Sequence, residues 1–385
     1  MSLLKRILLA LLCLAVMVCV WFLTSSVSPV VREEPVIFEP TPELTPELTP
    51  ETTPEPTPEL TPEPTPEPTP EPAPEYFTIN MIGDCTLASA PYFRGSSVGY
   101  DTVVGDDYAY PFAETLQYFE DDDLTVANLE CVLSDYDTAA DKNFVFRAEP
   151  AYVNIMAEGS VELVTLGNNH VLDYGQTGYD DTKAALDGVG IAYAGRDEWT
   201  LYTTESGLTV GMYAVSFGNT DQIKAGIKAL RDAGAEFIIA ALHWGDEGSY
   251  SVNGLQLTLG HAAIDAGADI VYGTHPHTLQ PVEEYNGHYI YYSMGNWSFG
   301  GNTDPRDKDT FILRLTVMRD IDGSISIVER EHIPCACSGV KSGNNYQPVP
   351  YDPESEEYAR TLSKLDGSFT GANLTIGYEY NYNEF

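Results

Sequence analysis

Five apolar segments of this chain each lead directly into a loop rich in side chains that bind metals. The mostly apolar residues 268–272 precede Gly-Thr-His-Pro-His at 273–277, which sets two imidazoles two positions apart. A strand that ends in such a turn holds these side chains on a rigid scaffold. The arrangement recurs at Gly83-Asp84, Asn128-Leu129-Glu130, Gly167-Asn168-Asn169-His170 and His243-Trp244-Gly245. Because Asp, Glu, Asn and His follow the strands, the pattern predicts an α/β sheet with a metal centre at its strand ends.

Residues 76–365 alternate short apolar strands with helical patterns, as a layered α/β domain requires. Strands are predicted at residues 77–82, 124–127, 161–166, 191–194, 209–215, 237–242 and 270–272. Helices are predicted at residues 180–189, 221–233 and 254–266. The turn pairs Asn286-Gly287 and Asp322-Gly323 predict hairpins that involve residues 289–293, 311–318 and 324–329. We therefore expect a second, more antiparallel sheet in the C-terminal third.

The first residues have the composition of a membrane-targeting segment. Lys5 and Arg6 precede an apolar run at residues 7–23, about 26 Å of helix and near the lower limit for crossing hydrocarbon. We expect residues 1–29 to form a cytoplasmic tip and an uncleaved transmembrane anchor, with cleavage near residues 24–28 as the alternative. Positive charge before the span keeps the N-terminus in the cytoplasm, so the main domain is expected outside the cell membrane.

Residues 30–75 are a low-complexity segment dominated by a Thr-Pro-Glu repeat. Proline at this density excludes helix and sheet, and the spaced glutamates repel one another, so the segment is expected to be a disordered, extended stalk. It either lifts the domain away from the membrane or acts as a neutral spacer. Residues 366–385 form a C-terminal tail that is aromatic and acidic at its end, and the sequence assigns it no role.

Charge limits the partners of this chain. The formal net charge is -39, from 58 acidic and 19 basic residues. Nucleic acid is not an expected partner because the sequence offers no basic face to neutralise phosphates. A polyanionic ligand would have to meet a local cation, such as a bound metal, Arg147 or Arg196.

Four cysteines lie beyond the apolar N-terminal run, and a disulfide is permitted outside the membrane. Cys85 and Cys131 directly follow Asp84 and Glu130 at two predicted strand ends. A Cys85–Cys131 disulfide is therefore one hypothesis. The other is a pair of small buried thiols.

Taken in order, these motifs resemble those of the CapA family, the poly-gamma-glutamate capsule biosynthesis proteins. The resemblance runs from about residue 76 to residue 365 and also rests on Asp173-Tyr174-Gly175, on Glu247 and on Ser293-Met294-Gly295-Asn296. That family looks like a branch of the calcineurin-like metallophosphoesterases. The resemblance therefore implies a four-layer α-β-β-α sandwich with a two-metal centre at the strand ends.

The resemblance also implies residue roles, with His170 as the catalytic histidine. The implied metal ligands are Asp84, Glu130, Asn169, His243, His275 and His277, and the supporting residues are Asn128, Asn168, Asp173, Glu247 and Asn296. His243 and His275 look like ligands of one metal, and His277 looks like a ligand of the other. Glu130 is preferred to Asn128 as the bridging group because an anionic oxygen pair readily bridges two cations.

One departure from the resemblance matters: metallophosphoesterases usually carry a histidine where this chain has Thr86, so one metal would lose a ligand. Ligands of these types suit one or two ions of manganese, iron or zinc. Two functions in capsule or poly-gamma-glutamate biosynthesis or export stay open. The chain is either a metal-dependent hydrolase that cuts a phosphoester or an amide, or a non-catalytic component that binds the polymer or a membrane synthase.

Overall fold

A computed structural model of the chain describes residues 73–376, which fall in a single unit. The predicted anchor at residues 1–29, nearly all of the predicted stalk and residues 377–385 of the tail lie outside the described residues. Within residues 73–376, no helix combines the length and the apolar character needed to cross a membrane.

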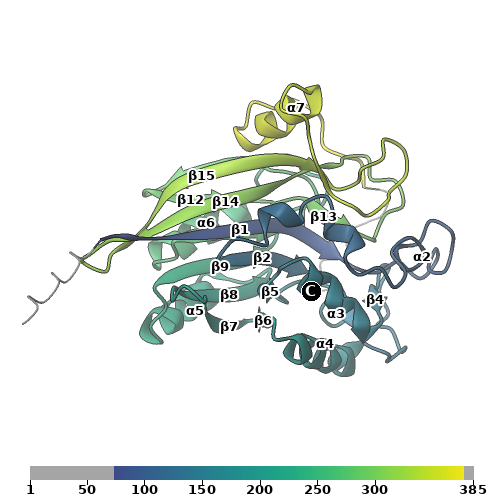
Figure 1. Cartoon of the computed structure of the whole chain (residues 1–385), viewed down its shortest axis with the longest axis horizontal. Coiled ribbons are helices and arrows are strands. Elements are labelled where there is room, and N and C mark those ends of the chain that lie inside the picture. The colour runs from purple at the N-terminus through teal and green to yellow at the C-terminus, as the bar shows by residue number, and fades with distance from the viewer. Residues whose placement is uncertain (1–72, 377–385) are drawn as a thin grey trace, which may run out of the picture. The chain divides into compact units, whose positions relative to one another are not determined.

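Two β-sheets form the centre of the unit (Figure 1). The first sheet runs in the order β16 (Val349–Pro350), β15 (Ile325–Ala336), β14 (Asp309–Arg319), β1 (Glu75–Thr86), β2 (Leu124–Leu129), β5 (Leu163–Thr165) and β6 (Ala192–Ala194), and β13 (Asn296–Phe299) pairs with the end of β1. The second runs in the order β11 (Val282–Tyr285), β12 (His288–Tyr291), β10 (Ile270–Thr274), β9 (Phe237–His243), β8 (Thr209–Ser216) and β7 (Glu198–Thr203). The short strands β3 (Val132–Leu133) and β4 (Arg147–Ala148) pair with each other.

Helices cover the outer faces of both sheets. The helices α3 (Val153–Glu158) and α4 (Gly175–Val189) pack on the first sheet, and α5 (Thr220–Asp232) and α6 (Gly254–Asp265) pack on the second. Between the sheets, alternate side chains such as Ile79, Met212 and Ile239 form a separate apolar core. The layer order is therefore α-β-β-α. The remaining helices are α2 (Tyr100–Val103), η1 (Tyr110–Phe112), η2 (Leu116–Tyr118), η3 (Pro150–Tyr152) and α7 (Glu356–Leu365).

Each predicted strand and helix is present, but the predicted C-terminal antiparallel sheet is wrong. The hairpin of β14 and β15 extends the first sheet, because β14 pairs antiparallel with β1 (Figure 1). The hairpin of β11 and β12 instead joins the second sheet through parallel pairing of β12 with β10. The apolar face of β14, which includes Leu313 and Leu315, is buried in the core between the sheets. Period-2 alternation identifies such a face but does not identify the neighbouring strand.

Parallel pairing brings the ligand-rich loops to one edge of each sheet. In the first sheet, Asp84 of β1 is in register with Asn128 of β2, and Asn128 is in register with Thr165 of β5. In the second sheet, His243 at the end of β9 is in register with Thr274 of β10. Because the carboxyl ends of parallel strands meet at one edge, residues far apart in the sequence come together there.

Candidate metal centre

Asp84 begins a chain of buried hydrogen bonds across the strand ends of the first sheet. Nδ2 of Asn128 donates to Oδ1 of Asp84 at 2.8 Å, and Nδ2 of Asn168 donates to Oδ1 of Asn128 at 3.0 Å. Nδ2 of Asn168 also donates to the carbonyl of Leu129 at 2.9 Å, and its Oδ1 accepts from the His170 amide at 3.1 Å. Asn128 and Asn168 therefore orient the Asp84 carboxylate and fix the start of the loop that carries His170.

The second sheet supplies three histidines to the same place. His243 ends β9, while His275 and His277 follow β10 with φ angles of 97° and 56°. Non-glycine residues rarely adopt such left-handed backbone, and its occurrence at two positions separated by one residue is typical of a functional loop. The loop meets Asp84 twice, since Oδ2 of Asp84 lies 3.4 Å from the amide nitrogen of His275 and 3.1 Å from Nδ1 of His277.

Glu130 lies between these groups and is fully buried. Its Oε1 is 3.4 Å from Nε2 of His243 and 3.9 Å from Nε2 of His277. Among the described residues, neither carboxylate oxygen of Glu130 accepts a hydrogen bond. A buried carboxylate without donors is costly, and a cation is the partner that best removes this cost. The residues present therefore fit a metal ion.

Three sets of side chains within residues 73–376 place ligand atoms within 4.8 Å of one another. They are Glu130 with His243 and His275, Asp84 with Glu130 and His277, and Glu247 with His275 and His277. Glu130, His275 and His277 each occur in two of the three sets, so neighbouring cations would share these ligands. The donors are carboxylate oxygens and imidazole nitrogens, which suit first-row divalent metals.

The protonation of the histidines is set by burial and by neighbouring charge. Burial, followed by the charges of nearby histidines, lowers the pKa values of His243 and His275 well below the usual range, so both imidazoles are neutral. Burial also opposes charge on His277, but the carboxylates of Glu130 and Asp84 raise the pKa of His277 to about 10. Burial and the Asp84 charge raise the pKa of Glu130. Without metal, a proton on His277 thus offsets part of the negative charge.

His170 occupies a different position from the ligand sets. Its Nδ1 forms a 2.7 Å hydrogen bond with Oδ2 of Asp173, whose other oxygen accepts from Nζ of Lys142 at 2.8 Å. Its ring packs on Phe146, with ring centroids 4.6 Å apart. Because Asp173 engages Nδ1, Nε2 is the nitrogen that remains for a ligand in the adjacent cavity, which His170 lines.

Asn169 lies between His170 and the ligand sets. Its Oδ1 is 2.8 Å from Nε2 of His243, and its carbonyl accepts from Nζ of Lys142 at 2.8 Å. Asn296 makes the corresponding contact on the other side, with its Oδ1 2.9 Å from Nδ1 of His277. Both amide oxygens point to ligand-set histidines.

A cavity of about 360 Å³ opens over this constellation. Asn169, His170, Glu247, His277 and Asn296 line it on the side of the ligand sets. Its other walls combine aromatic residues, two cations and a C-terminal segment. These walls include Tyr92, Phe93, Phe144, Phe146, Phe299, Lys142, Arg306, Leu374 and Ile376.

The structure brings all the predicted metal-binding and supporting residues to this one edge, and their chemical roles stay predictions. Sequence reasoning missed Lys142, Thr274 and the C-terminal wall residues. Thr274, one residue before His275, has its hydroxyl 2.9 Å from Nδ1 of His243, and its place in the Gly-Thr-His motif was the available signal. Thr86 is buried, and within residues 73–376 its hydroxyl has no hydrogen-bond partner.

The structure does not contain the Cys85–Cys131 disulfide that was one of the two hypotheses, since both residues are buried free thiols. The Cys85 thiol donates to the carbonyl of Gly83 at 3.7 Å, whereas the Cys131 thiol meets the backbone of Leu87. Burial raises the pKa values of both thiols, that of Cys131 to about 12. The alternative of two small buried side chains describes them correctly.

Comparison with protein families identifies relatives of this chain. The family model described as bacterial capsule synthesis protein PGA_cap matches residues 78–300. The PGA biosynthesis protein CapA of Bacillus subtilis is 32% identical over 196 residues, covering 44% of this chain and 50% of the relative. The capsule biosynthesis protein CapA of Bacillus anthracis is 28% identical over 259 residues, covering 58% of this chain and 60% of the relative. The chain thus spans about half to three fifths of the length of these two relatives.

A probable polyglutamine synthesis accessory protein of Mycobacterium tuberculosis is 28% identical over 260 residues, covering 57% of this chain and 68% of the relative. Among solved structures, the Haemophilus influenzae NAD nucleotidase covers 77% of this chain and 56% of its own, at a TM-score of 0.37 and 13% identity. The match to a purple acid phosphatase from yellow lupin covers 78% of this chain and 57% of the phosphatase, at a TM-score of 0.29 and 11% identity. These TM-scores are too low to assign fold or function.

The family assignment rests on the sequence match. The matched residues 78–300 make up more than half of the chain and include every residue of the three ligand sets. The chain belongs to the bacterial capsule synthesis protein PGA_cap family.

Proposed function

We propose that this protein acts in the biosynthesis or export of poly-gamma-glutamate or a related capsule polymer, and that its strand-end site is a divalent-metal hydrolase site. Membership of the capsule synthesis family supports the first part. The observation that carries the second is Glu130, a buried carboxylate without a hydrogen-bond donor among residues 73–376, placed between His243 and His277. Manganese, iron or zinc, as one or two ions, suits these donors.

The residues divide the proposed chemistry between binding and proton transfer. Asp84, Glu130, His243, His275 and His277 would hold the metal, with Asn169 and Glu247 beside them. A divalent cation, when bound, supplies Lewis-acid activation of a phosphoester or amide oxygen and of an attacking water. The two neutral imidazoles, His243 and His275, are already in the protonation state that ligation needs.

His170 is the proposed general acid. Its Nδ1 is held by Asp173, which fixes the ring and leaves Nε2 as the nitrogen that can exchange a proton with a ligand in the adjacent cavity. From there, His170 would give its proton to the leaving group. Asp173 is itself held by Lys142 and by the backbone amide of Phe146 at 2.7 Å, so the geometry of the pair is fixed by its surroundings.

We also propose that the domain lies outside the cell membrane, tethered by residues 1–29 and the stalk at residues 30–75. The apolar run at residues 7–23 after Lys5 and Arg6 supports this topology. Such a topology would place the site beside a membrane synthase and the emerging polymer, the proposed partners. The net charge of -39 opposes broad electrostatic capture of polyglutamate, so contact would be local and metal-assisted.

A specific observation favours a second function, that of a non-catalytic scaffold that binds the polymer or the synthase. Thr86 stands where a histidine ligand is expected from the metallophosphoesterase resemblance. Its buried hydroxyl is a much weaker ligand than an imidazole, so one metal position would be weakened. A weakened site could bind an anionic group without hydrolysing it.

Metal content and turnover, measured together, test the proposal. The purified protein would be reconstituted with manganese, iron or zinc, and its metal content measured by elemental mass spectrometry. Aryl phosphoesters and γ-glutamyl peptides would then be screened for turnover. Turnover that a chelator abolishes and that His170→Ala removes supports the hydrolase. Bound metal without turnover favours the scaffold, and absence of metal after reconstitution contradicts the hydrolase and leaves a scaffold without a metal site.

A further inference from the structure

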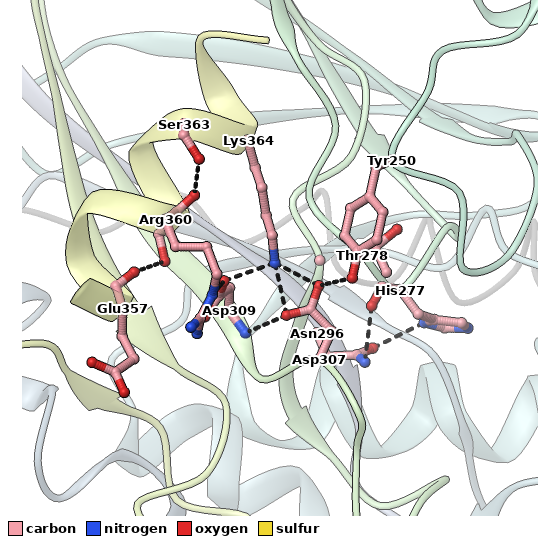
Figure 2. A network of polar contacts seen from close by, with 12 residues as sticks. Tyr250, His277, Thr278, Asn296, Asp307, Asp309, Glu357, Arg360, Ser363 and Lys364 are labelled. Atoms are coloured by element: carbon pink, nitrogen blue, oxygen red, sulfur yellow. Dashed lines mark hydrogen bonds and ion pairs between the residues drawn. The ribbon is translucent and has the colours of Figure 1, made fainter. Parts of the chain in front are cut away.

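The helix α7 is joined to the cavity by a buried lysine. Lys364 is only 3% exposed, and its Nζ lies 2.8 and 2.7 Å from the two carboxylate oxygens of Asp307 and 2.7 Å from Oδ2 of Asp309. Figure 2 shows Lys364 reaching from α7 toward both carboxylates, with Arg360 beside it. Asp307 lines the cavity, so this ion pair links the C-terminal helix directly to the cavity wall.

The two aspartates depend on these cations for their position. Arg360 donates to Asp309 through Nε at 2.7 Å and Nη2 at 2.6 Å, which is a bidentate pair. Lys364 is the group that bridges Asp307 to Asp309. Removal of one partner from a buried ionic cluster leaves an uncompensated charge. Without Lys364, Asp307 would lose its cation beside a second carboxylate, and the loop that carries it would move.

Tyr250 extends the same network to the loop after Glu247. Its hydroxyl donates to Oδ2 of Asp307 at 2.8 Å, and its ring lies 4.9 Å from Nζ of Lys364 (Figure 2). The neighbouring carbonyl of Ser249 accepts from Oγ1 of Thr278 at 2.9 Å, one residue after His277. Lys364 therefore braces the loop that carries Glu247 as well as the loop that carries Asp307.

The chain then returns across the same loops as a strap, defined here as residues 373–376. Its Leu374 amide donates to the carbonyl of Gly248 at 2.9 Å, and the Thr375 carbonyl accepts from Nη2 of Arg306 at 2.5 Å. The side chains of Leu374 and Ile376 are half-buried and line the cavity. An apolar wall thus stands beside the exposed guanidinium of Arg306 and across from the candidate metal ligands.

We propose that the strap, held in place through Lys364, is a specificity-determining wall that selects ligands with an apolar group beside an anionic group. The inference rests on the proposed function, because the anionic group would meet the metal centre and Arg306. Leu374 and Ile376 would cover the apolar group of the ligand. If either side chain is shortened, less apolar surface of the ligand is buried, and binding weakens. Lys364 is a positioning residue, since it acts through the loops and not on the ligand.

Binding of two phosphonates to the manganese-loaded full-length chain, purified in detergent, tests this wall by calorimetry. Methylphosphonate and phenylphosphonate carry the same anionic group and differ in apolar size. We expect the parent to prefer phenylphosphonate, and Leu374→Ala or Ile376→Ala to reduce that preference about three- to tenfold. Lys364→Met should reduce it similarly, while methylphosphonate affinity and metal content stay unchanged in the two strap variants. Leu255→Ala is the matched control, because Leu255 is 47% exposed on α6 and does not line the cavity.

The outcomes separate this inference from the proposed function. Equal binding of both phosphonates to the parent, or a preference that Leu374→Ala and Ile376→Ala leave unchanged, overturns the specificity wall alone. Binding of neither phosphonate to metal-loaded protein overturns the anion-binding metal site, and the wall with it. If Lys364→Met unfolds the chain, the two strap variants still decide the question.

Discussion

Nε2 of His277 lies 3.9 Å from Oε1 of Glu130, although the two residues follow strands of different sheets. Glu130 follows β2 in the first sheet, and His277 follows β10 in the second. The candidate metal centre therefore joins the two halves of the sandwich at one end. Ligand geometry depends on how the sheets face each other, and the core of Ile79, Met212 and Ile239 sets that arrangement.

The first prediction concerns the histidines after β10. His275→Ala combined with His277→Ala should abolish stoichiometric metal binding, because these residues take part in all three ligand sets. Elemental mass spectrometry after reconstitution and gel filtration measures this loss. His288→Ala, at a histidine outside the ligand sets, serves as the control and should retain parental metal content. Full metal content in the double variant would contradict the site.

The second prediction separates proton transfer from metal binding. His170→Ala should lower kcat for a phosphoester by about 10²- to 10⁴-fold, the usual contribution of a general acid. Metal content should remain parental, since His170 belongs to none of the ligand sets. Steady-state kinetics and metal analysis on the same preparation test both parts. Loss of metal together with activity would show that His170 acts as a ligand and not as the acid.

The third prediction concerns pH and stability at the opposite end of the first sheet. Burial raises the pKa of Glu162 to about 7, and it raises that of Asp122 to about 6. The folded state therefore binds more protons than the unfolded state between about pH 4.5 and 7, and the free energy of unfolding falls as the pH rises through this window. Glu162→Gln should flatten this dependence while its side-chain oxygen still accepts from the Thr125 amide.

Urea unfolding of metal-free protein at pH 5 and pH 8 measures this effect. Glu158→Gln, an exposed position on α3, is the matched control and should keep the parental pH dependence. The prediction fails if Glu162→Gln and the parent lose the same unfolding free energy between the two pH values.

The sequence predicts the centre of this site because its signal is local. Apolar runs that end at Asp84, Glu130 and His243 mark strand ends, and parallel strands share one edge, so convergence follows from the fold class. The Gly-Thr-His-Pro-His motif carries both His275 and His277, two positions apart in one loop. Short-range pattern and the geometry of α/β sheets are sufficient to place these residues.

The outer walls of the site are not predictable in this way. Leu374 meets Gly248 through one backbone hydrogen bond, and residues 366–376 have neither helical nor strand periodicity. In the sequence, nothing distinguishes Lys364 from an ordinary cation in the last turn of a helix, where cations are common. Its burial depends on Asp307 and Asp309, which a long connection brings beneath the helix. Such contacts depend on tertiary packing, which local pattern does not encode.

The last prediction tests the cost of the buried charge at the site. Glu130→Gln should stabilise the metal-free protein at pH 8, because the neutral amide avoids the burial cost that raises the pKa of the Glu130 carboxyl. The expected rise in Tm is about 2–6 °C.

The same variant should bind metal far more weakly, since it removes the anionic oxygens that two ligand sets share. Thermal unfolding in chelator and in excess manganese measures both effects, with Glu354→Gln at an exposed position as the control. A parent that is already more stable than Glu130→Gln in chelator would mean that Glu130 stabilises the fold without metal, and would remove the main support for a metal centre here.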